Sequence, residues 1–144
     1  MEYPVYGTSD YRNPAVEILQ ENGSRISEFK YISHEITDGK PELAGLPATY
    51  VEEPEEAQTL CLRLKDEVTG IVLELLYSIF SGKGILARSA RFINEGIVPV
   101  HLLNAMSLSL DLPDSDYVWM QCSGVWARER HIIERKLEQG IQAV

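Results

Sequence analysis

The sequence predicts an all-β protein that folds as an antiparallel β-sandwich. Apolar residues recur at every second position in several runs, as they do in strands that bury one face. Turn signals separate these runs at short intervals, which is typical of β-sandwiches. These signals are Asn22-Gly23, Asp38-Gly39, Gly82-Lys83-Gly84, Asn94-Glu95-Gly96 and Pro113-Asp114. The 144 residues are enough for one domain with a core and too few to predict two.

Two strand pairs are predicted from the turns between alternating runs. Asn22-Gly23 lies between two such runs within residues 15–32, and Asn-Gly in this position is the strongest short signal for a hairpin. Leu60–Lys65 and Ile71–Phe80 flank the segment DEVTG, which predicts a longer antiparallel hairpin. The alternation returns in residues 100–110 and predicts a further strand there.

The run of residues 71–80 is apolar on both faces of the predicted strand. Its apolar side chains are Ile71, Leu73 and Leu75 on one face and Val72, Leu76 and Phe80 on the other. Such a strand needs cover on both sides, from a second sheet or from another domain. We therefore expect the chain to be part of a larger protein. Residues 51–58, VEEPEEAQ, are acidic and interrupted by proline, which predicts a solvated loop or edge.

Residues 127–139 allow two interpretations. Their composition has high helix propensity, and Gly140 stands where a helix would end. The apolar stripe is narrow, however, because Ile132 and Ile133 are adjacent and only Leu137 follows. The residues themselves therefore favour a strand slightly and leave a helix open.

The acidic composition argues against polyanionic partners. The formal net charge is −9 and the isoelectric point is about 4.8. A surface of this charge repels phosphate backbones and anionic lipids. The basic residues within 128–136 alternate with Glu129 and Glu134, which offset them. We expect neither nucleic acid nor a membrane as a partner.

The chain is expected to be cytoplasmic. Its first residues, MEYPVYGTSDYR, have neither the basic nor the apolar region of a signal peptide. The longest apolar run, residues 71–80, is too short to span a bilayer. Cys61 and Cys122 lie far apart in alternating apolar runs. We expect both to be free, buried thiols, as in a reducing compartment.

Residue chemistry predicts no catalytic, metal or cofactor site. His34, His101 and His131 lack the spacing of zinc ligands. The aspartates of DLPDSD, residues 111–116, lack the glycine and glutamate of a calcium loop and are better explained as a turn. Ser123-Gly124 lacks the frame of a nucleophile elbow. We expect no catalytic residue in this chain and no cofactor.

The two tryptophans also allow two interpretations. An exposed indole ring can stack on the apolar face of a hexose, whereas a buried one packs in a core. Core packing is the preferred interpretation for Trp119 and Trp126. We expect Trp126 in particular to be largely buried.

Several motifs resemble one protein family. Ser107–His131, SLSLDLPDSDYVWMQCSGVWARERH, is similar to a run in the N-terminal domain of the large microbial α-galactosidases of glycoside hydrolase family 36. That family carries D-L-P-D-x-D-Y followed by S-G-x-W-x-R-E-R. Upstream, YGTSDYRNPAVEI matches Y-G-x-G-D-[FY]-R-x-P-A, with Ser9 where glycine is usual. ENGSRISEFKYISHEI, KPELAGLPATYVE and ARSARFINEG match further stretches in the same order.

The resemblance implies a fold and a role. The chain would be a fragment of a non-catalytic N-terminal β-supersandwich, residues 1–144, without the (β/α)8 barrel that carries the two catalytic aspartates. The parent would be a retaining α-galactosidase acting on melibiose or raffinose, and a homo-oligomer, expected to be a tetramer. The resemblance also favours a strand for residues 127–139. The alternative is a stand-alone carbohydrate-binding or interaction module.

The segment YGTSDYR, residues 6–12, holds the candidate substrate-binding residues Asp10, Tyr11 and Arg12. One interpretation is a turn in which Asp10 caps backbone amides and Arg12 pairs with an acidic residue. The other is a loop that reaches a substrate pocket in the assembled parent enzyme. A carboxylate and a guanidinium can each bridge sugar hydroxyls, and a tyrosine ring can stack on a pyranose.

Overall fold

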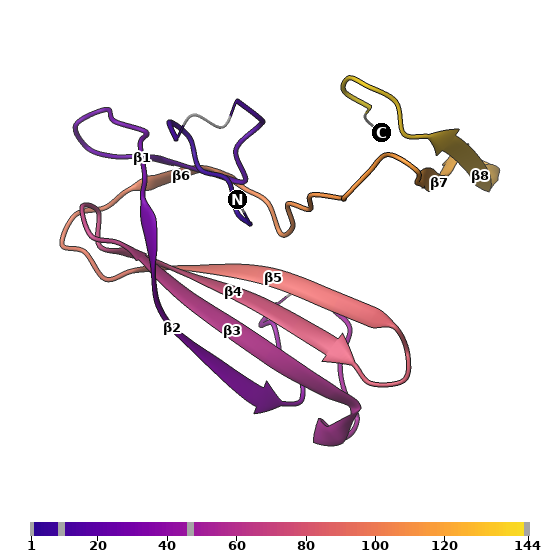
Figure 1. Cartoon of the computed structure of the whole chain (residues 1–144), viewed down its shortest axis with the longest axis horizontal. Coiled ribbons are helices and arrows are strands. Elements are labelled where there is room, and N and C mark those ends of the chain that lie inside the picture. Colours follow the sequence, from indigo (N-terminus) through magenta and orange to yellow (C-terminus); the bar gives the residue numbers. More distant parts are fainter. Residues whose placement is uncertain (1, 9–10, 46–47, 143–144) are drawn as a thin grey trace. The chain divides into compact units, whose positions relative to one another are not determined.

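The computed structural model describes residues 2–8, 11–45 and 48–142. The chain folds as two compact units, Met1–Ser109 and Leu110–Val144. The predicted all-β, antiparallel fold is confirmed, since the described residues form eight strands and a single 3-10 turn. Their order is shown in Figure 1. The prediction of a single domain stays a prediction.

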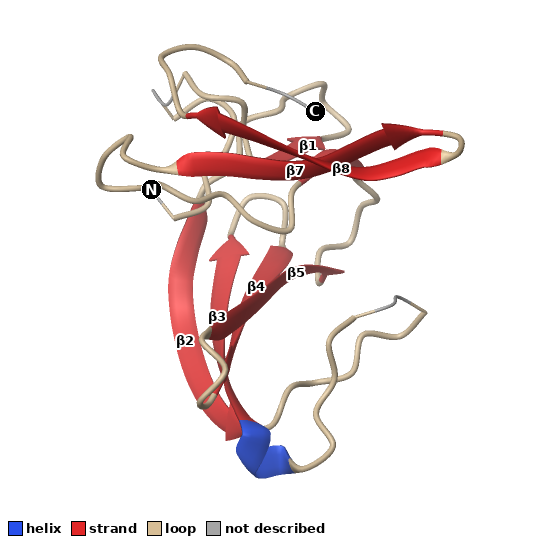
Figure 2. Cartoon of the chain, turned by 90° about the vertical axis from the view of Figure 1, so that its right-hand side faces the viewer, coloured by secondary structure: helices blue, strands red, loops and turns tan. Residues whose placement is uncertain are grey.

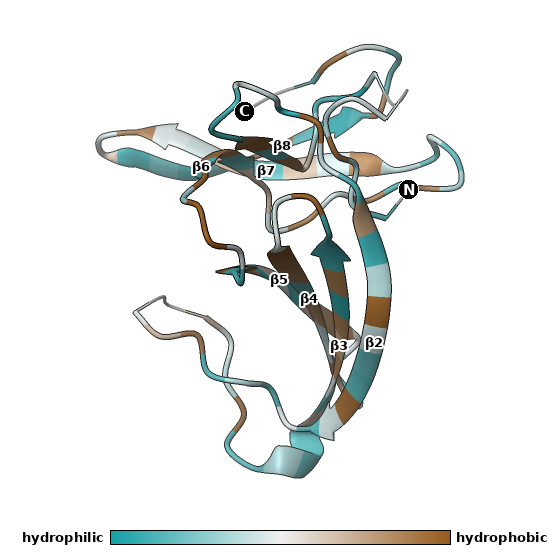
Figure 3. Ribbon diagram, turned by 90° about the vertical axis from the view of Figure 1, so that its left-hand side faces the viewer, coloured by the Kyte–Doolittle hydropathy of each residue, from teal (hydrophilic) through white to brown (hydrophobic). Residues whose placement is uncertain are grey.

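The first unit contains six of the strands and the 3-10 turn at Pro54–Glu56. The strands are β1 (Val16–Leu19), β2 (Phe29–Asp38), β3 (Ala57–Asp66), β4 (Ile71–Phe80), β5 (Ile85–Asn94) and β6 (His101–Ala105). Four of them form an antiparallel sheet in the order β2-β3-β4-β5, seen side by side in Figure 2. β2 carries both apolar and polar residues along its length (Figure 3).

The predicted long hairpin is confirmed as β3 and β4. Leu64 lies opposite Leu73, and Leu62 lies opposite Leu75. The turn between the strands is closed by Asp66, whose Oδ1 accepts the backbone N–H of Val68 at 2.9 Å. An acidic side chain that caps its own turn is a common solution in short connections.

The predicted hairpin around Asn22-Gly23 is wrong. A turn does form there, with the N–H of Gly23 donating to the carbonyl of Gln20 at 3.0 Å. The flanking strands nevertheless pair elsewhere, since β1 pairs with β6 and β2 pairs with β3. The turn signal specifies only the local backbone, whereas the strand that β1 pairs with is decided by the burial of its side chains. Val16 and Ile18 of β1 are 1% exposed, in a layer above the larger sheet.

The core lies between the β1–β6 layer and one face of the four-stranded sheet. Its fully buried apolar residues include Val16, Ile18, Ile71, Leu73 and Leu75. Phe29, Leu62, Leu64, Tyr77, Ala90 and Phe92 of the larger sheet pack against this cluster. The other face of β4 is buried as well, because Val72 is 0% and Glu74 is 5% exposed. The two-sided strand expected at residues 71–80 is therefore present.

The second unit is a two-stranded ribbon of β7 (Val118–Val125) and β8 (Arg128–Lys136). The strand interpretation of residues 127–139 is confirmed for the part within β8. Ala127 in the connecting turn has a φ of 63°, in the left-handed region that favours glycine.

Two burial predictions fail in the second unit. Trp126 is 92% exposed, because it lies in the turn of the two-stranded β7–β8 ribbon. Cys122, on β7, is exposed, and Cys61 in the first unit is only partly buried. Both cysteines are free, as expected. Among the described residues, no helix is long and apolar enough to cross a membrane.

Candidate functional site

The candidate loop of residues 6–12 precedes β1. Asp10 lies outside the described residues. Tyr11 and Arg12 are both exposed, and the accessible fraction of Tyr11 is 99%. The structure therefore leaves the side chain of Tyr11 available to a partner.

The ends of the loop are fixed to the core by backbone hydrogen bonds. The carbonyl of Pro4 accepts the N–H groups of Ala15 at 2.8 Å and Val16 at 3.4 Å. Val5 and Val16 form an isolated parallel bridge. The amide of Asn104 donates to the carbonyl of Pro14 at 2.6 Å. The exposed residues thus emerge from a base that is part of the β1–β6 layer.

A second set of contacts holds the first residues of the loop. The guanidinium of Arg25 lies 5.2 Å from the ring centroid of Tyr6 and pairs with Glu17 at 2.8 Å. Gly7 has a φ of 87°, and a Cβ placed on it would lie 2.9 Å from Cγ1 of Ile26. Both the backbone conformation and the close contact require glycine at this position.

Two tyrosines anchor the N-terminal arm, defined here as residues 2–5. The Tyr3 hydroxyl donates to the carbonyl of Met106, and the Tyr77 hydroxyl donates to the Glu2 carboxylate at 2.6 Å. Burial raises the pKa of both Tyr3 and Tyr77, and the charge of Arg88 opposes that rise. The arm that leads into the loop is therefore held by β4 and by the residue after β6.

A half-open cavity of about 490 Å³ lies beside the N-terminal arm. Apolar side chains of the core face of the sheet form much of its lining, with Glu2, Thr8 and Glu28 among the polar members. The apolar part consists of Val5, Phe29, Leu62, Leu64, Leu73 and Leu75. Because this is the core face, we interpret the cavity as an unfilled part of the sandwich interior.

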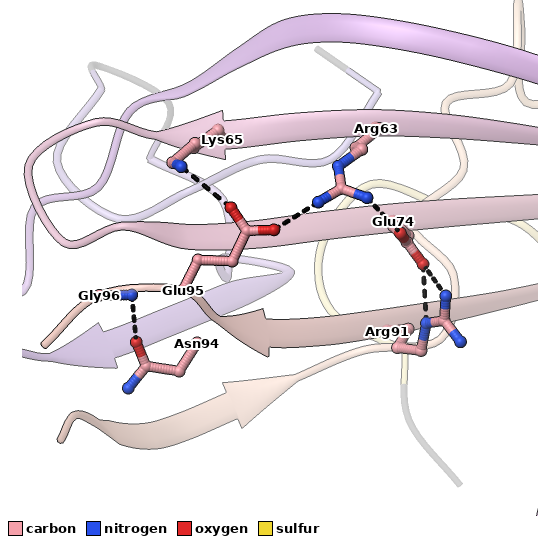
Figure 4. Close-up of polar contacts among 7 residues, drawn as sticks. All are labelled: Arg63, Lys65, Glu74, Arg91, Asn94, Glu95 and Gly96. Atoms are coloured by element: carbon pink, nitrogen blue, oxygen red, sulfur yellow. Dashed lines mark hydrogen bonds and ion pairs between the residues drawn. The ribbon is translucent and has the colours of Figure 1, made fainter.

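A charged cluster lies on the opposite face of the four-stranded sheet (Figure 4). The buried carboxylate of Glu74 accepts hydrogen bonds from Nη1 of Arg63 at 3.4 Å and from Nε of Arg91 at 2.7 Å. Glu95 pairs with Arg63 and with Nζ of Lys65 at 3.0 Å. The hydrogen bond from Lys65 lowers the pKa of Glu95. Both carboxylates are held by cations, so this cluster stabilises the sheet and does not resemble a general acid–base pair.

His34 and Asp114, two of the remaining polar candidates, have structural partners. The Tyr31 hydroxyl and Nδ1 of His34 are 2.6 Å apart. The N–H of Asp116 donates to Oδ1 of Asp114 at 2.9 Å, as expected for a turn. No group of three or more metal-binding side chains occurs in the part of the chain that the structure describes. Asp111 also makes a polar or electrostatic interaction.

Sequence reasoning missed the anchoring residues Tyr3, Tyr77 and Arg88. Each lies within an otherwise ordinary alternating or N-terminal segment, where its residue type carries no motif. One signal was available: an arginine at the centre of the partly apolar run in residues 85–94 is unusual in a strand that faces a core.

The fold and these motifs are shared with a known family. The sequence profile of the glycosyl hydrolase family 36 N-terminal domain matches residues 1–144. The chain belongs to this family. The resemblance expected from the sequence motifs is thereby confirmed.

The relatives of this family 36 N-terminal domain include α-galactosidases from bacteria and fungi. Alpha-galactosidase AgaA of Geobacillus stearothermophilus is 46% identical over 142 residues, which are 99% of this chain and 20% of the relative. Alpha-galactosidase Mel36A of Lactobacillus acidophilus is 35% identical over 141 residues, 98% of this chain and 19% of the relative. This domain therefore spans about a fifth of the length of these proteins.

Solved structures share the fold of this domain. The crystal structure of AgaA from Geobacillus stearothermophilus matches it with a TM-score of 0.94 at 45% identity, covering 99% of this chain and 20% of that protein. The α-galactosidase of Lactobacillus brevis matches with a TM-score of 0.92 at 42% identity, covering 98% and 19%. Variants of AgaA have been solved in complex with raffinose and with stachyose.

Proposed function

We propose that this domain supports the active site of an α-galactosidase without contributing catalytic residues. The match of the family profile to the whole chain, together with the α-galactosidases among its relatives, carries the proposal. The substrates would be terminal α-galactosides such as melibiose, raffinose and stachyose, the last two of which are bound by a close relative. The parent protein would be cytoplasmic, in keeping with the two free cysteines.

We propose further that Asp10, Tyr11 and Arg12 contact the sugar. The exposed ring of Tyr11 is available for stacking on a pyranose, and Arg12 presents a guanidinium from the same loop. The hydrogen bonds of Pro4 and Asn104 at the loop base restrict its position. Side chains on a fixed base lose less entropy on binding and so contribute to affinity and positioning.

The test is steady-state kinetics of the full-length α-galactosidase that carries this domain. Asp10→Ala, Tyr11→Ala and Arg12→Ala should each raise KM for raffinose several-fold, about 3- to 10-fold, with a smaller effect on kcat. Glu67→Ala, an exposed change in the β3–β4 turn, is the matched control. If KM is unchanged in all three loop variants, the sugar contact is ruled out and only the turn interpretation of residues 6–12 remains.

A second experiment tests the non-catalytic role. The 144-residue chain by itself is expected to show no turnover of a chromogenic α-galactoside. Hydrolysis that a single substitution in the chain abolishes would overturn this expectation.

The domain is also proposed to take part in a homo-oligomer, expected to be a tetramer. An oligomer would allow the exposed loop to reach the active site of a neighbouring subunit. Light scattering of the full-length enzyme after size exclusion gives its mass directly. A monomer that retains full activity on raffinose would contradict the proposal.

A further inference from the structure

Arg88 is a buried arginine on the core face of the sandwich. It lies on β5, directly opposite Tyr77 on β4, and its side chain is 3% exposed. Its guanidinium carbon lies 4.9 Å from the ring centroid of Tyr77 and 5.0 Å from that of Tyr3. The cation is thus in contact with two aromatic rings that come from different parts of the chain.

The guanidinium of Arg88 links three segments. Nη1 donates to the carbonyl of Ser107, just after β6, and Nη2 donates to the Tyr77 hydroxyl at 3.2 Å. The Tyr77 hydroxyl in turn donates to Glu2, whose carboxylate lies 4.0 Å from Nη2. β5, the exit of β6 and the N-terminal arm therefore meet at one side chain.

Burying this cation carries a cost in stability. Removing a charged group from water carries a large penalty that good partners only partly offset. Nε of Arg88 is buried without a hydrogen-bond partner, which adds to that penalty. A methionine of similar length would fill the same space without either cost. What methionine cannot do is orient Ser107, Tyr77 and Glu2 relative to one another.

The contacts of Arg88 with the N-terminal arm affect the loop that begins at Tyr6 and ends before Ala15. The N-terminal arm enters this loop at Tyr6, and the loop returns to the sandwich at Ala15, which donates to Pro4 of the same arm. Met106, whose carbonyl accepts the Tyr3 hydroxyl, also donates its N–H to the carbonyl of Ala15 at 2.8 Å. A shift of the arm would therefore move both ends of the loop.

We propose that Arg88 is a positioning residue for substrate binding, which acts by fixing the base of the loop that carries Tyr11 and Arg12. This inference rests on the proposed sugar contact of that loop. Arg88 itself does not touch the substrate. It sets the direction from which the loop residues leave the sandwich.

The experiment compares variants of the full-length α-galactosidase that carries this domain. Arg88→Met should raise KM for raffinose roughly fivefold, while kcat falls less than twofold, because a displaced loop weakens positioning rather than chemistry. Arg88→Lys keeps the charge and a single donor nitrogen and should restore part of the loss. Arg91→Met is the matched control, since it removes an arginine of the same strand on the opposite face.

A double variant tests the route through the loop. If Arg88 acts through Arg12, then Arg88→Met combined with Arg12→Ala should raise KM little more than Arg12→Ala alone. If the KM increases of Arg88→Met and Arg12→Ala instead multiply in the double variant, the inference is overturned. The inference is also overturned if a folded Arg88→Met enzyme keeps the wild-type KM while Arg12→Ala raises KM. In that case the proposed sugar contact of the loop still stands. Unchanged KM in the loop variants would instead overturn both.

If Arg88→Met does not fold, Tyr77→Phe gives the same test. It removes only the hydroxyl between Arg88 and Glu2 and keeps the ring. A rise in KM of about twofold, again without a matching fall in kcat, is expected. A lowered melting temperature with wild-type KM would assign the cluster a purely structural role and contradict the proposal.

Discussion

Gly70 and Gly96 lie so close to each other that neither position has room for a side chain. A Cβ placed on Gly70 would lie 2.7 Å from Cα of Gly96, and a Cβ on Gly96 would lie 2.3 Å from the carbonyl oxygen of Thr69. The N–H of Glu95 donates to the carbonyl of Gly70 at 3.1 Å. The β3–β4 turn and the end of β5 are therefore packed backbone against backbone.

Gly70→Ala should destabilise this chain by about 2–4 kcal/mol, the sum of a left-handed backbone and a steric overlap. Gly23→Ala is the matched control, because Gly23 has a similar φ of 82° and a Cβ placed on it would meet no atom within 4 Å. It should cost about 1 kcal/mol. Urea unfolding of both variants measures the difference, and equal losses would show that the backbone contact is absent in solution.

Trp126→Ala should change the free energy of unfolding of this chain by less than about 0.5 kcal/mol, because the ring is exposed in the β7–β8 turn. Trp119→Ala provides the comparison, since Trp119 is partly buried on β7 and should cost more. Urea unfolding followed by circular dichroism checks both. A loss above about 2 kcal/mol for Trp126→Ala would mean that the ring is buried in solution.

Local patterns predicted the β3–β4 hairpin, because it depends on alternation and on a short connection. The residues of 128–136 only slightly favoured the strand found there, and the family resemblance strengthened that prediction. The pairing of β1 with β6 has no such signal. Val16 lies opposite Ala105, and nothing near either residue specifies a partner so far along the chain. The Asn22-Gly23 signal misled for the same reason, since it specifies a turn and not the partners of the flanking strands.

The residue types of the candidate loop can be read from the sequence, whereas the contacts that hold its base cannot. Tyr11 and Arg12 stand out because polar and aromatic groups crowd a glycine-containing loop. The role proposed for Arg88 depends on its register opposite Tyr77 and on the approach of Tyr3 from the N-terminal arm. These are tertiary relationships, and period-two alternation contains no information about them.

Removing the arginines that pair with Glu74 should cost more stability than removing Glu74 itself. In Arg63→Met combined with Arg91→Met, the buried carboxylate of Glu74 loses both partners, and the cost should be about 3 kcal/mol. Glu74→Met leaves two arginines that are 38% and 67% exposed and can be solvated, so its cost should stay below about 1.5 kcal/mol. Urea unfolding at neutral pH measures both, and the reverse order would contradict this account.

The buried tyrosines should make the domain sensitive to alkali. Burial is the main reason that the pKa values of Tyr3 and Tyr77 lie above 10.0. Above that pH the unfolded chain releases their protons first, so it binds fewer protons than the folded chain and the free energy of unfolding falls. The free energy of unfolding is therefore unaffected by the ionisation of these two tyrosines below pH 10.0. It falls as the pH rises from 10.0 through the raised pKa values that Tyr3 and Tyr77 have in the folded chain.

Tyr3→Phe combined with Tyr77→Phe should therefore lose less stability than the parent chain between roughly pH 9 and 11. The double variant begins from a lower stability at neutral pH, because it lacks the hydrogen bonds to Met106 and Glu2. Urea midpoints across this pH range give the two slopes. Tyr50→Phe removes a phenol from a 75% exposed position and is the matched control, expected to follow the parent. Parallel slopes for parent and double variant would show that neither phenol is buried in the folded chain.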